Sequence, residues 1–134
     1  MAERVSSLLR RSVGHLEGEV PASYRHMLEA LGPLVVEVDV DGEVFSLSGG
    51  RRLDVTDGSA ATAGARIGSS RAAILDLLDA RFGLDEAVQA GVVSVHGSLD
   101  DILRAHDALL AYVHAAVRAP SHPELLDELR AGPQ

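Results

Sequence analysis

The 134-residue chain contains no cysteine, no lysine and no tryptophan. Without cysteine there can be no disulfide, thiolate nucleophile or cysteine-ligated zinc, and the redox compartment is left open. All twelve basic residues are arginine, which excludes a lysine Schiff base, a P-loop lysine and a lysine-rich membrane-binding patch. Composition alone therefore removes several enzyme classes.

Aromatic residues are scarce, at 3% of the chain, and the formal net charge is −8. Few aromatic rings are present on which bases could stack, and the negative charge would repel a phosphate backbone. We therefore expect no nucleic-acid partner. The 46% share of hydrophobic residues is enough for one buried core, and the chain length fits a single domain.

Long apolar runs are also missing. The longest, Ala108 to Val117, is interrupted by His114 and is about half the length of a membrane-spanning helix. The first residues carry Glu3 and Arg4 and lack the apolar core of a secretory signal. These features predict a cytoplasmic protein that does not insert into a membrane, and the arginine- and alanine-rich composition suits a bacterial source.

The first half of the chain predicts two helices followed by a strand meander. Apolar residues recur with helical spacing over 5–16 and again after Pro21, and alternation over 34–40 then indicates a half-buried strand. Asp41-Gly42 suits a two-residue hairpin turn. This turn predicts the cross-strand pairs Val40–Glu43, Val38–Phe45 and Val36–Leu47.

The next strand is predicted to follow a three-residue loop over 49–51. This loop would set Leu53 against Leu47 and Val55 against Phe45, whereas a two-residue loop would bury charged residues. A fourth strand is expected over 61–67, although the pattern does not identify its partner.

The second half of the chain alternates helices with one strand. A helix capped by Ser69 or Ser70 is expected to end at Gly83, a short helix to span 85–90, and a fifth strand to span 92–96. Ser98 and Asp101 resemble a capping box that opens a long helix. We expect that helix to bury the stripe Leu99, Ile102, Leu103, His106, Leu110, Val113 and Val117. Pro120 should end it, and Ser121 should cap a last small helix.

Recognisable catalytic motifs are absent. The sequence contains no G-x-G-x-x-G, P-loop, H-E-x-x-H or G-x-S-x-G pattern, and no histidine spacing matches a metal-ligand motif, so we expect no cofactor and no metal. His106 falls on the apolar stripe of the long helix. It is interpreted either as a core histidine bonded to a backbone carbonyl or as a polar group in a ligand pocket.

Residues 67–98, with the long helix that follows, resemble the sterol carrier protein type-two (SCP2) lipid-binding family. The similar segments are Ile67-Gly68-Ser69-Ser70, then Phe82-Gly83-Leu84-Asp85-Glu86-Ala87, then Gly91 to Ser98. The resemblance covers about residues 21 to 118 and departs from the family at Ser98, where an acidic residue is usual. It implies an α+β fold in which helices cover one face of a five-stranded sheet and enclose an apolar tunnel.

This resemblance implies a carrier of an apolar small molecule such as a sterol, a fatty acyl chain, or a polyketide or terpenoid-like compound. Residues 1–20 would form an N-terminal amphipathic helix, 21–118 the SCP2-like domain, and 119–134 a C-terminal helical tail that covers the tunnel mouth or pairs two subunits in a homodimer. By alternation, the residues expected to line the tunnel are Val36, Val38, Phe45, Leu47, Leu53, Ile67, Leu77, Leu78, Phe82, Val93, Val95, Leu99, Ile102 and Leu103.

Two other functions remain open at this point. The same pocket could serve a cofactor-free cyclase or isomerase in a bacterial biosynthetic pathway, with Tyr24, Arg66 and His106 as its catalytic candidates. Alternatively, the cavity is collapsed and the chain is a protein-interaction module. The family has no shared catalytic residues to carry over to this sequence, so a non-enzymatic carrier is the leading hypothesis.

Overall fold

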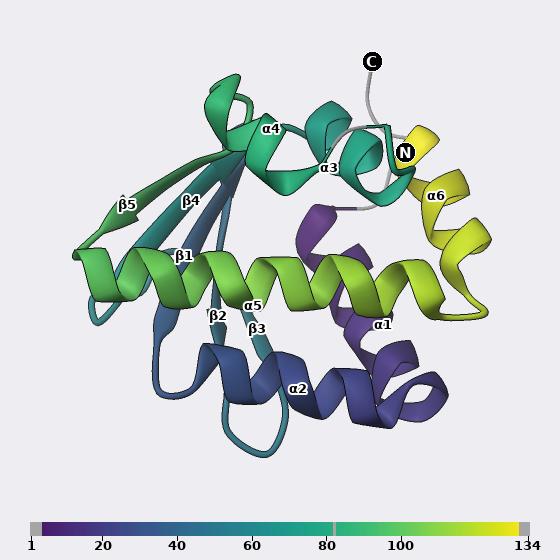
Figure 1. The fold of residues 1–134 in the computed structure, drawn as a ribbon, viewed down its shortest axis with the longest axis horizontal. Coiled ribbons are helices and arrows are strands. Elements are labelled where there is room, and N and C mark those ends of the chain that lie inside the picture. The colour runs from purple at the N-terminus through teal and green to yellow at the C-terminus, as the bar shows by residue number, and fades with distance from the viewer. Residues whose placement is uncertain (1–3, 82, 132–134) are drawn as a thin grey trace.

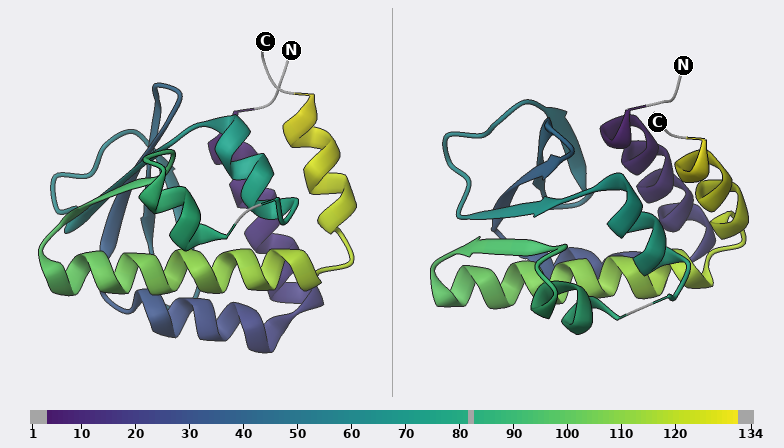
Figure 2. Two further views of the ribbon diagram at one scale, coloured as in Figure 1. Left: turned by 45° about the horizontal axis from the view of Figure 1, so that its top comes forward. Right: turned by 90° about the horizontal axis from the view of Figure 1, so that it is seen from above.

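The computed structural model describes residues 4–81 and 83–131. The chain forms a five-stranded sheet with helices packed on one side (Figures 1 and 2). The elements are α1 (Val5–Glu19), α2 (Pro21–Leu31), β1 (Val35–Val40), β2 (Glu43–Ser48), β3 (Asp54–Asp57), β4 (Ala65–Ser69), α3 (Arg71–Leu78), α4 (Leu84–Gln89), β5 (Ser94–Gly97), α5 (Leu99–Arg118) and α6 (His122–Arg130). This is the predicted α+β class.

The first hairpin has the predicted register. Val36 lies opposite Leu47, Val38 opposite Phe45, and Val40 opposite Glu43. Asp41 and Gly42 both have positive φ, 53° and 89°, as a tight two-residue turn requires. The alternating strand residues thus share one buried face of the sheet.

The second hairpin differs from the prediction by two residues. Leu47 pairs with Val55 instead of Leu53, and Phe45 pairs with Asp57 instead of Val55, so the loop spans 49–53. The backbone N–H of Leu53 donates to the Tyr24 hydroxyl at 3.0 Å, which ties the longer loop to α2. A shift of two residues keeps every side chain on its predicted face.

The fourth strand begins later than expected, at Ala65, so residues 61–64 are not part of it. It pairs in parallel with β1 and antiparallel with β5, giving the sheet order β3-β2-β1-β4-β5. The fifth strand is also shorter than predicted and starts at Ser94.

The third helix ends at Leu78, before the predicted end at Gly83. Ala80 adopts a left-handed φ of 59°, and the backbone N–H groups of Ala80 and Arg81 donate back to carbonyls of the last turn. This ending usually employs glycine, so an alanine there gave no signal in the sequence. The predicted start is confirmed, because the Ser70 side chain accepts from the Ala73 N–H at 3.0 Å.

The long helix has the predicted start but buries a different face. Ser98 caps it by accepting from the Asp101 N–H at 3.2 Å. Its buried residues are the small ones, Ala105, Ala108, Ala111, Ala115 and Ala116. The predicted buried stripe is wrong at three positions, because Leu99 is 72% exposed and Leu103 and Val117 are also exposed. Leu110 and Val113, on the same stripe, are half-buried against the core.

This difference arises because α5 packs closely along α2. Figures 1 and 2 show the two helices side by side. Two helices can approach closely only where the side chains between them are small. The alanine face of α5 therefore turns inward, and Leu99, Leu103 and Val117 turn to solvent.

The last helix begins at His122, directly after Ser121 as predicted, but the Ser121 side chain makes no capping hydrogen bond. Instead, the Ser121 backbone N–H donates to Glu19 Oε1 at 2.9 Å. This contact joins the start of α6 to the end of α1.

Candidate apolar binding site

An apolar cavity of about 130 Å³ lies between the inner face of the sheet and the surrounding helices. Its walls come from strands β1, β2 and β4 and from helices α1, α2, α3, α5 and α6. The lining residues are Val5, Leu8, Leu9, Met27, Leu31, Val36, Val38, Val40, Phe45, Leu47, Leu53, Ile67, Ser69, Ile74, Leu77, Leu78, Val93, Ala105, Ala108, Leu109, Tyr112, Leu125 and Leu129.

The cavity exists because large and small side chains meet in its walls. The sheet contributes branched and aromatic residues such as Val36 and Phe45, whereas α5 contributes Ala105 and Ala108. An alanine in this position leaves space that a leucine would fill. Apolar cavities of about 150 Å³ in other proteins stay dry and admit benzene, so this volume is sufficient for a small apolar group.

Only two polar side chains line the cavity among the described residues, Ser69 and Tyr112. Ser69 donates its hydroxyl to the Val92 carbonyl at 3.1 Å. The Tyr112 hydroxyl lies 2.8 Å from the Ser12 hydroxyl. Burial raises the pKa of Tyr112 to about 12, although the hydrogen bond with Ser12 opposes this shift, so the phenol stays neutral at physiological pH.

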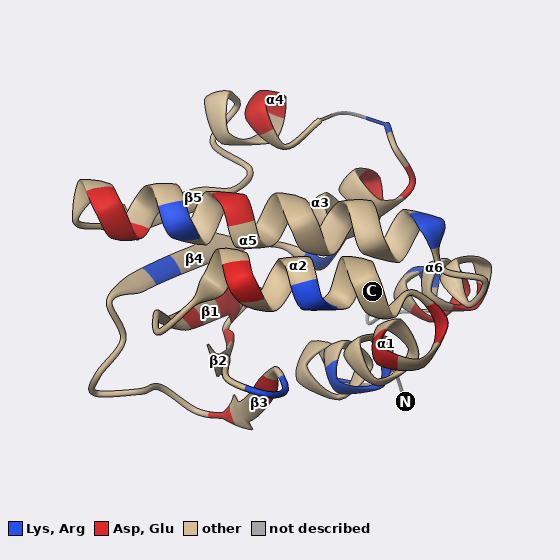
Figure 3. Cartoon of the chain, turned by 60° about the horizontal axis from the view of Figure 1, so that its bottom comes forward, with Lys and Arg blue, Asp and Glu red and all other residues tan. Residues whose placement is uncertain are grey.

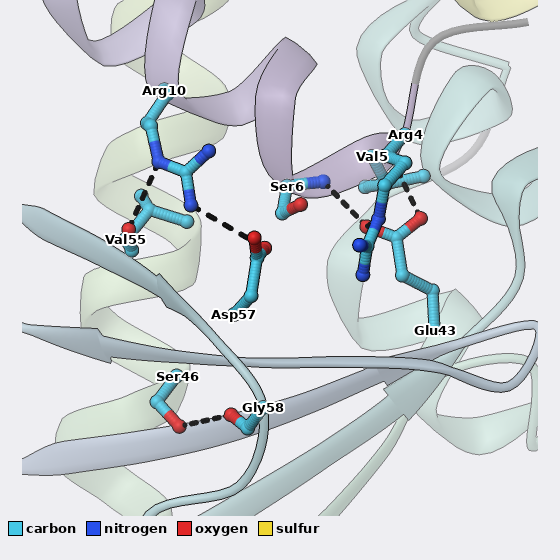
Figure 4. A network of polar contacts seen from close by, with 9 residues as sticks. All are labelled: Arg4, Val5, Ser6, Arg10, Glu43, Ser46, Val55, Asp57 and Gly58. Atoms are coloured by element: carbon cyan, nitrogen blue, oxygen red, sulfur yellow. Dashed lines mark hydrogen bonds and ion pairs between the residues drawn. The ribbon is translucent and has the colours of Figure 1, made fainter.

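The N-terminus of α1 is fixed over the sheet by Glu43 (Figure 4). The Glu43 carboxylate accepts from the backbone N–H groups of Val5 and Ser6, both at 2.9 Å, and lies 3.5 Å from Arg4 Nε. Partial burial raises the pKa of Glu43, but the two N–H donors and Arg4 outweigh it and hold the pKa below its usual 4.5. A carboxylate is the favourable group at a helix N-terminus.

One turn further along α1, Arg10 joins the helix to β3 (Figure 4). Its Nε donates to the Val55 carbonyl at 3.0 Å, and its Nη2 pairs with Asp57 at 3.3 Å. This ion pair explains how Asp57 can lie opposite Phe45 in the sheet without an unpaired charge. Together with Glu43, it holds the Val5 and Leu8 side chains against the cavity.

The C-terminal helix is held by arginines on its neighbours. Arg71 of α3 is almost fully buried and donates to the Leu129 and Glu128 carbonyls, at 3.2 and 3.1 Å. Those carbonyls lie in the last turn of α6, where a cation is stabilising. Arg11 of α1 pairs with the Glu128 carboxylate. These contacts place Leu125 and Leu129 in the cavity wall.

The residues expected to line the tunnel fall into three groups. Those on the cavity wall are Val36, Val38, Phe45, Leu47, Leu53, Ile67, Leu77, Leu78 and Val93. Val95, Leu99, Ile102 and Leu103 lie outside the wall. Phe82 lies outside the described residues. The role of any of them in binding a ligand stays a prediction.

Sequence reasoning missed the walls that the terminal helices supply. The residues expected to line the tunnel all fall between Val36 and Leu103, whereas Leu8, Leu9, Leu125 and Leu129 also line the cavity. Their helical apolar spacing was visible in the sequence. Nothing in that spacing indicated that these helices fold back onto the same side of the sheet.

The three catalytic candidates are not brought together on the cavity wall. Tyr24 is buried and accepts from the Leu53 N–H, and Arg66 is exposed, 3.6 Å from Glu37. His106 Nε2 lies 3.1 Å from Asp85 Oδ1, and its side chain is 29% exposed. The expectation of a core histidine bonded to a backbone carbonyl is therefore wrong, because α4 presents a carboxylate to it.

Within residues 4–81 and 83–131, no cluster of three or more histidine, aspartate or glutamate side chains could hold a metal ion. The same part of the chain has no helix both long and apolar enough to span a membrane.

Comparisons with known proteins bear on the fold. No protein-family model matches the chain, and no curated protein matches its sequence. Among solved structures, the fold is similar to that of a UbiJ-SCP2 ubiquinone synthesis protein, with a TM-score of 0.55 and 21% identity over 80% of this chain and 91% of the other.

Two sterol carrier protein structures are similar to the same extent. The apo form of sterol carrier protein 2 from Yarrowia lipolytica gives a TM-score of 0.55 at 14% identity, covering 85% of this chain and 90% of the other. A second sterol carrier protein 2 gives 0.54 at 14% identity, covering 87% and 99%. The chain has an SCP2-like fold, as the sequence resemblance predicted.

Proposed function

We propose that the protein binds an apolar small molecule in the cavity between the sheet and the helices, and that it acts as a carrier. The observation that supports this most directly is the cavity wall, which is apolar apart from Ser69 and Tyr112 among the described residues. A packed core usually leaves few voids larger than one water, so a cavity of about 130 Å³ is a departure from ordinary packing.

The similar structures support the same proposal. Two are sterol carrier proteins and one is a ubiquinone synthesis protein, and sterols and ubiquinone are both apolar compounds. On this proposal, residues 21–118 form the carrier domain, while the helices within 1–20 and 119–134 complete its walls. Both helices, α1 and α6, supply side chains to the cavity wall.

The test fills the cavity without adding polarity. Ala108 lies on the wall, and Ala108→Leu would place a larger apolar side chain in the empty space. Ala72→Leu is the matched control, because Ala72 is an exposed residue of α3 that does not line the cavity. Toluene binding would be measured by NMR chemical-shift changes and by the rise in Tm.

We expect toluene to bind the wild type and the Ala72→Leu variant, and to bind the folded Ala108→Leu variant at least about ten-fold more weakly, because the space is filled. Native mass spectrometry of the freshly purified wild type should also detect a co-purified apolar compound. Equal toluene affinity for all three proteins would overturn the assignment of this cavity as the binding site.

A further inference from the structure

The cavity wall also bears on the charge of the ligand, on the premise of the proposed function. Among the described residues, no arginine, histidine, aspartate or glutamate lines the cavity. A charged head group inside it would therefore lack an opposite charge on the wall. Such a group is strongly disfavoured in an apolar site unless it becomes neutral.

The two polar groups on the wall already have partners. The Ser69 hydroxyl donates to a backbone carbonyl, and the Tyr112 hydroxyl is bonded to Ser12. A serine hydroxyl does not ionise near neutral pH, and burial raises the pKa of Tyr112 to about 12. Neither group therefore carries a charge near neutral pH. They can accept or donate one further neutral hydrogen bond, but they cannot neutralise a carboxylate.

Three arginines on helices that line the cavity, α1 and α3, hold its walls in place. Arg71 donates to the last carbonyls of α6, Arg11 pairs with Glu128, and Arg10 pairs with Asp57. An anionic ligand that recruited Arg71 would leave buried carbonyls of α6 without their donor. Other charges lie along the outer helices, as on α5, which carries Asp100 and Asp101 in its first turn and Arg118 in its last (Figure 3).

We propose that the ligand enters the cavity as an uncharged group, and that the protein discriminates against ionised fatty acids and alkyl ammonium ions in favour of neutral hydrocarbons and alcohols. At about 130 Å³, the cavity takes a portion of the size of a benzene ring or a short alkyl segment. The substrate class is therefore a neutral apolar molecule.

The experiment compares three probes with the same alkyl chain: 1-octanol, octanoate and octylammonium. Their affinities for the wild-type protein are measured by calorimetry at about pH 7 and about pH 4, and 1-octanol serves as the control for any effect of pH on the protein. An alkyl carboxyl group with a pKa of about 4.3, the value for glutamate, is neutral in only about one molecule in 500 at pH 7.

If only the neutral acid binds, octanoate should bind about 500-fold more weakly than 1-octanol at pH 7, and within about three-fold of it at pH 4. Octylammonium should bind weakly at both values. An affinity for octanoate at pH 7 within about ten-fold of that for 1-octanol would overturn the inference, because the carboxylate would then be tolerated inside the cavity or remain in solvent while the chain inserts.

The two proposals fail in different ways. If neither 1-octanol nor toluene binds, the proposed function fails. If 1-octanol binds, and binding is lost in Ala108→Leu but kept in Ala72→Leu, the function stands and only the octanoate comparison decides the preference for neutral ligands. Equal binding of 1-octanol to both variants would place the probe outside the cavity and overturn both proposals for this site.

Discussion

The inner face of the sheet and the outer face of α5 both carry regularly spaced large apolar side chains, yet their environments are opposite. Phe45 and Val36 on the sheet are 1% and 2% exposed, whereas Leu99 and Leu103 on α5 are 72% and 56% exposed. Apolar periodicity therefore identifies an element reliably, but it does not decide which of its faces is buried. On α5 the decision depends on how closely α2 approaches.

The largest difference between the two regions should appear on truncation to alanine. Phe45→Ala is expected to lower the free energy of unfolding by about 3–5 kcal/mol, because it removes a fully buried ring. Leu103→Ala, on the exposed stripe, should change it by less than about 0.5 kcal/mol. Urea denaturation measures both values, and a comparable loss in the two variants would mean that the α5 stripe is covered in solution.

The two faces of α5 can be compared within the same helix. Ala115 is fully buried, so Ala115→Leu should cost about 1–3 kcal/mol by overpacking the inward face of the helix. Val117→Leu, on the exposed face, adds volume without such a penalty and should stay within about 0.5 kcal/mol. Differential scanning calorimetry would show the contrast. A larger loss from Val117→Leu than from Ala115→Leu would reverse the assignment of faces.

The register of the sheet depends on the turn at Asp41-Gly42. Gly42→Val should destabilise the protein by about 1–3 kcal/mol, because a β-branched residue is strained at a φ of 89°. Gly14→Ala is the control, since Gly14 lies in α1 with open space around it, and this change should stabilise the helix slightly. A change within a few tenths of a kcal/mol for Gly42→Val would contradict the turn.

The smallest expected effect concerns the contact that joins the sheet to α1. Glu43→Gln removes the carboxylate at the helix N-terminus and should cost about 1 kcal/mol near pH 7. Because the folded-state pKa of Glu43 lies below its usual 4.5, its stabilisation is fully present above that pH. The stabilisation is lost as the pH falls through the folded-state pKa.

Denaturation at several pH values tests this linkage. The wild type should lose stability below about pH 4.5 more steeply than Glu43→Gln. Glu29→Gln serves as the control, because Glu29 is exposed on α2, and its profile should follow the wild type. Identical profiles for wild type and Glu43→Gln would show that the carboxylate does not cap α1 in solution.

The amino-acid sequence by itself determined the features that depend on near neighbours in the chain. The Asp41-Gly42 turn has the φ values and the cross-strand pairs that local geometry demands, and Ser70 and Ser98 cap their helices because a cap involves residues only three positions apart. The α+β class could be predicted for the same reason, since the order of strands and helices follows from such local signals. The SCP2-like fold was predicted from the resemblance of residues 67–98 to that family.

Only the tertiary structure decided the features that depend on contacts between distant segments. The loop before β3 is longer than its glycines suggest because Leu53 is bonded to Tyr24 of α2, and α5 buries alanines because α2 lies against it. The cavity walls from α1 and α6 likewise depend on Glu43 and Arg71, which meet backbone groups 38 and 58 positions away along the chain. Local propensity carries no information about such pairings, because the energy of each depends on a partner that only the folded chain brings into contact.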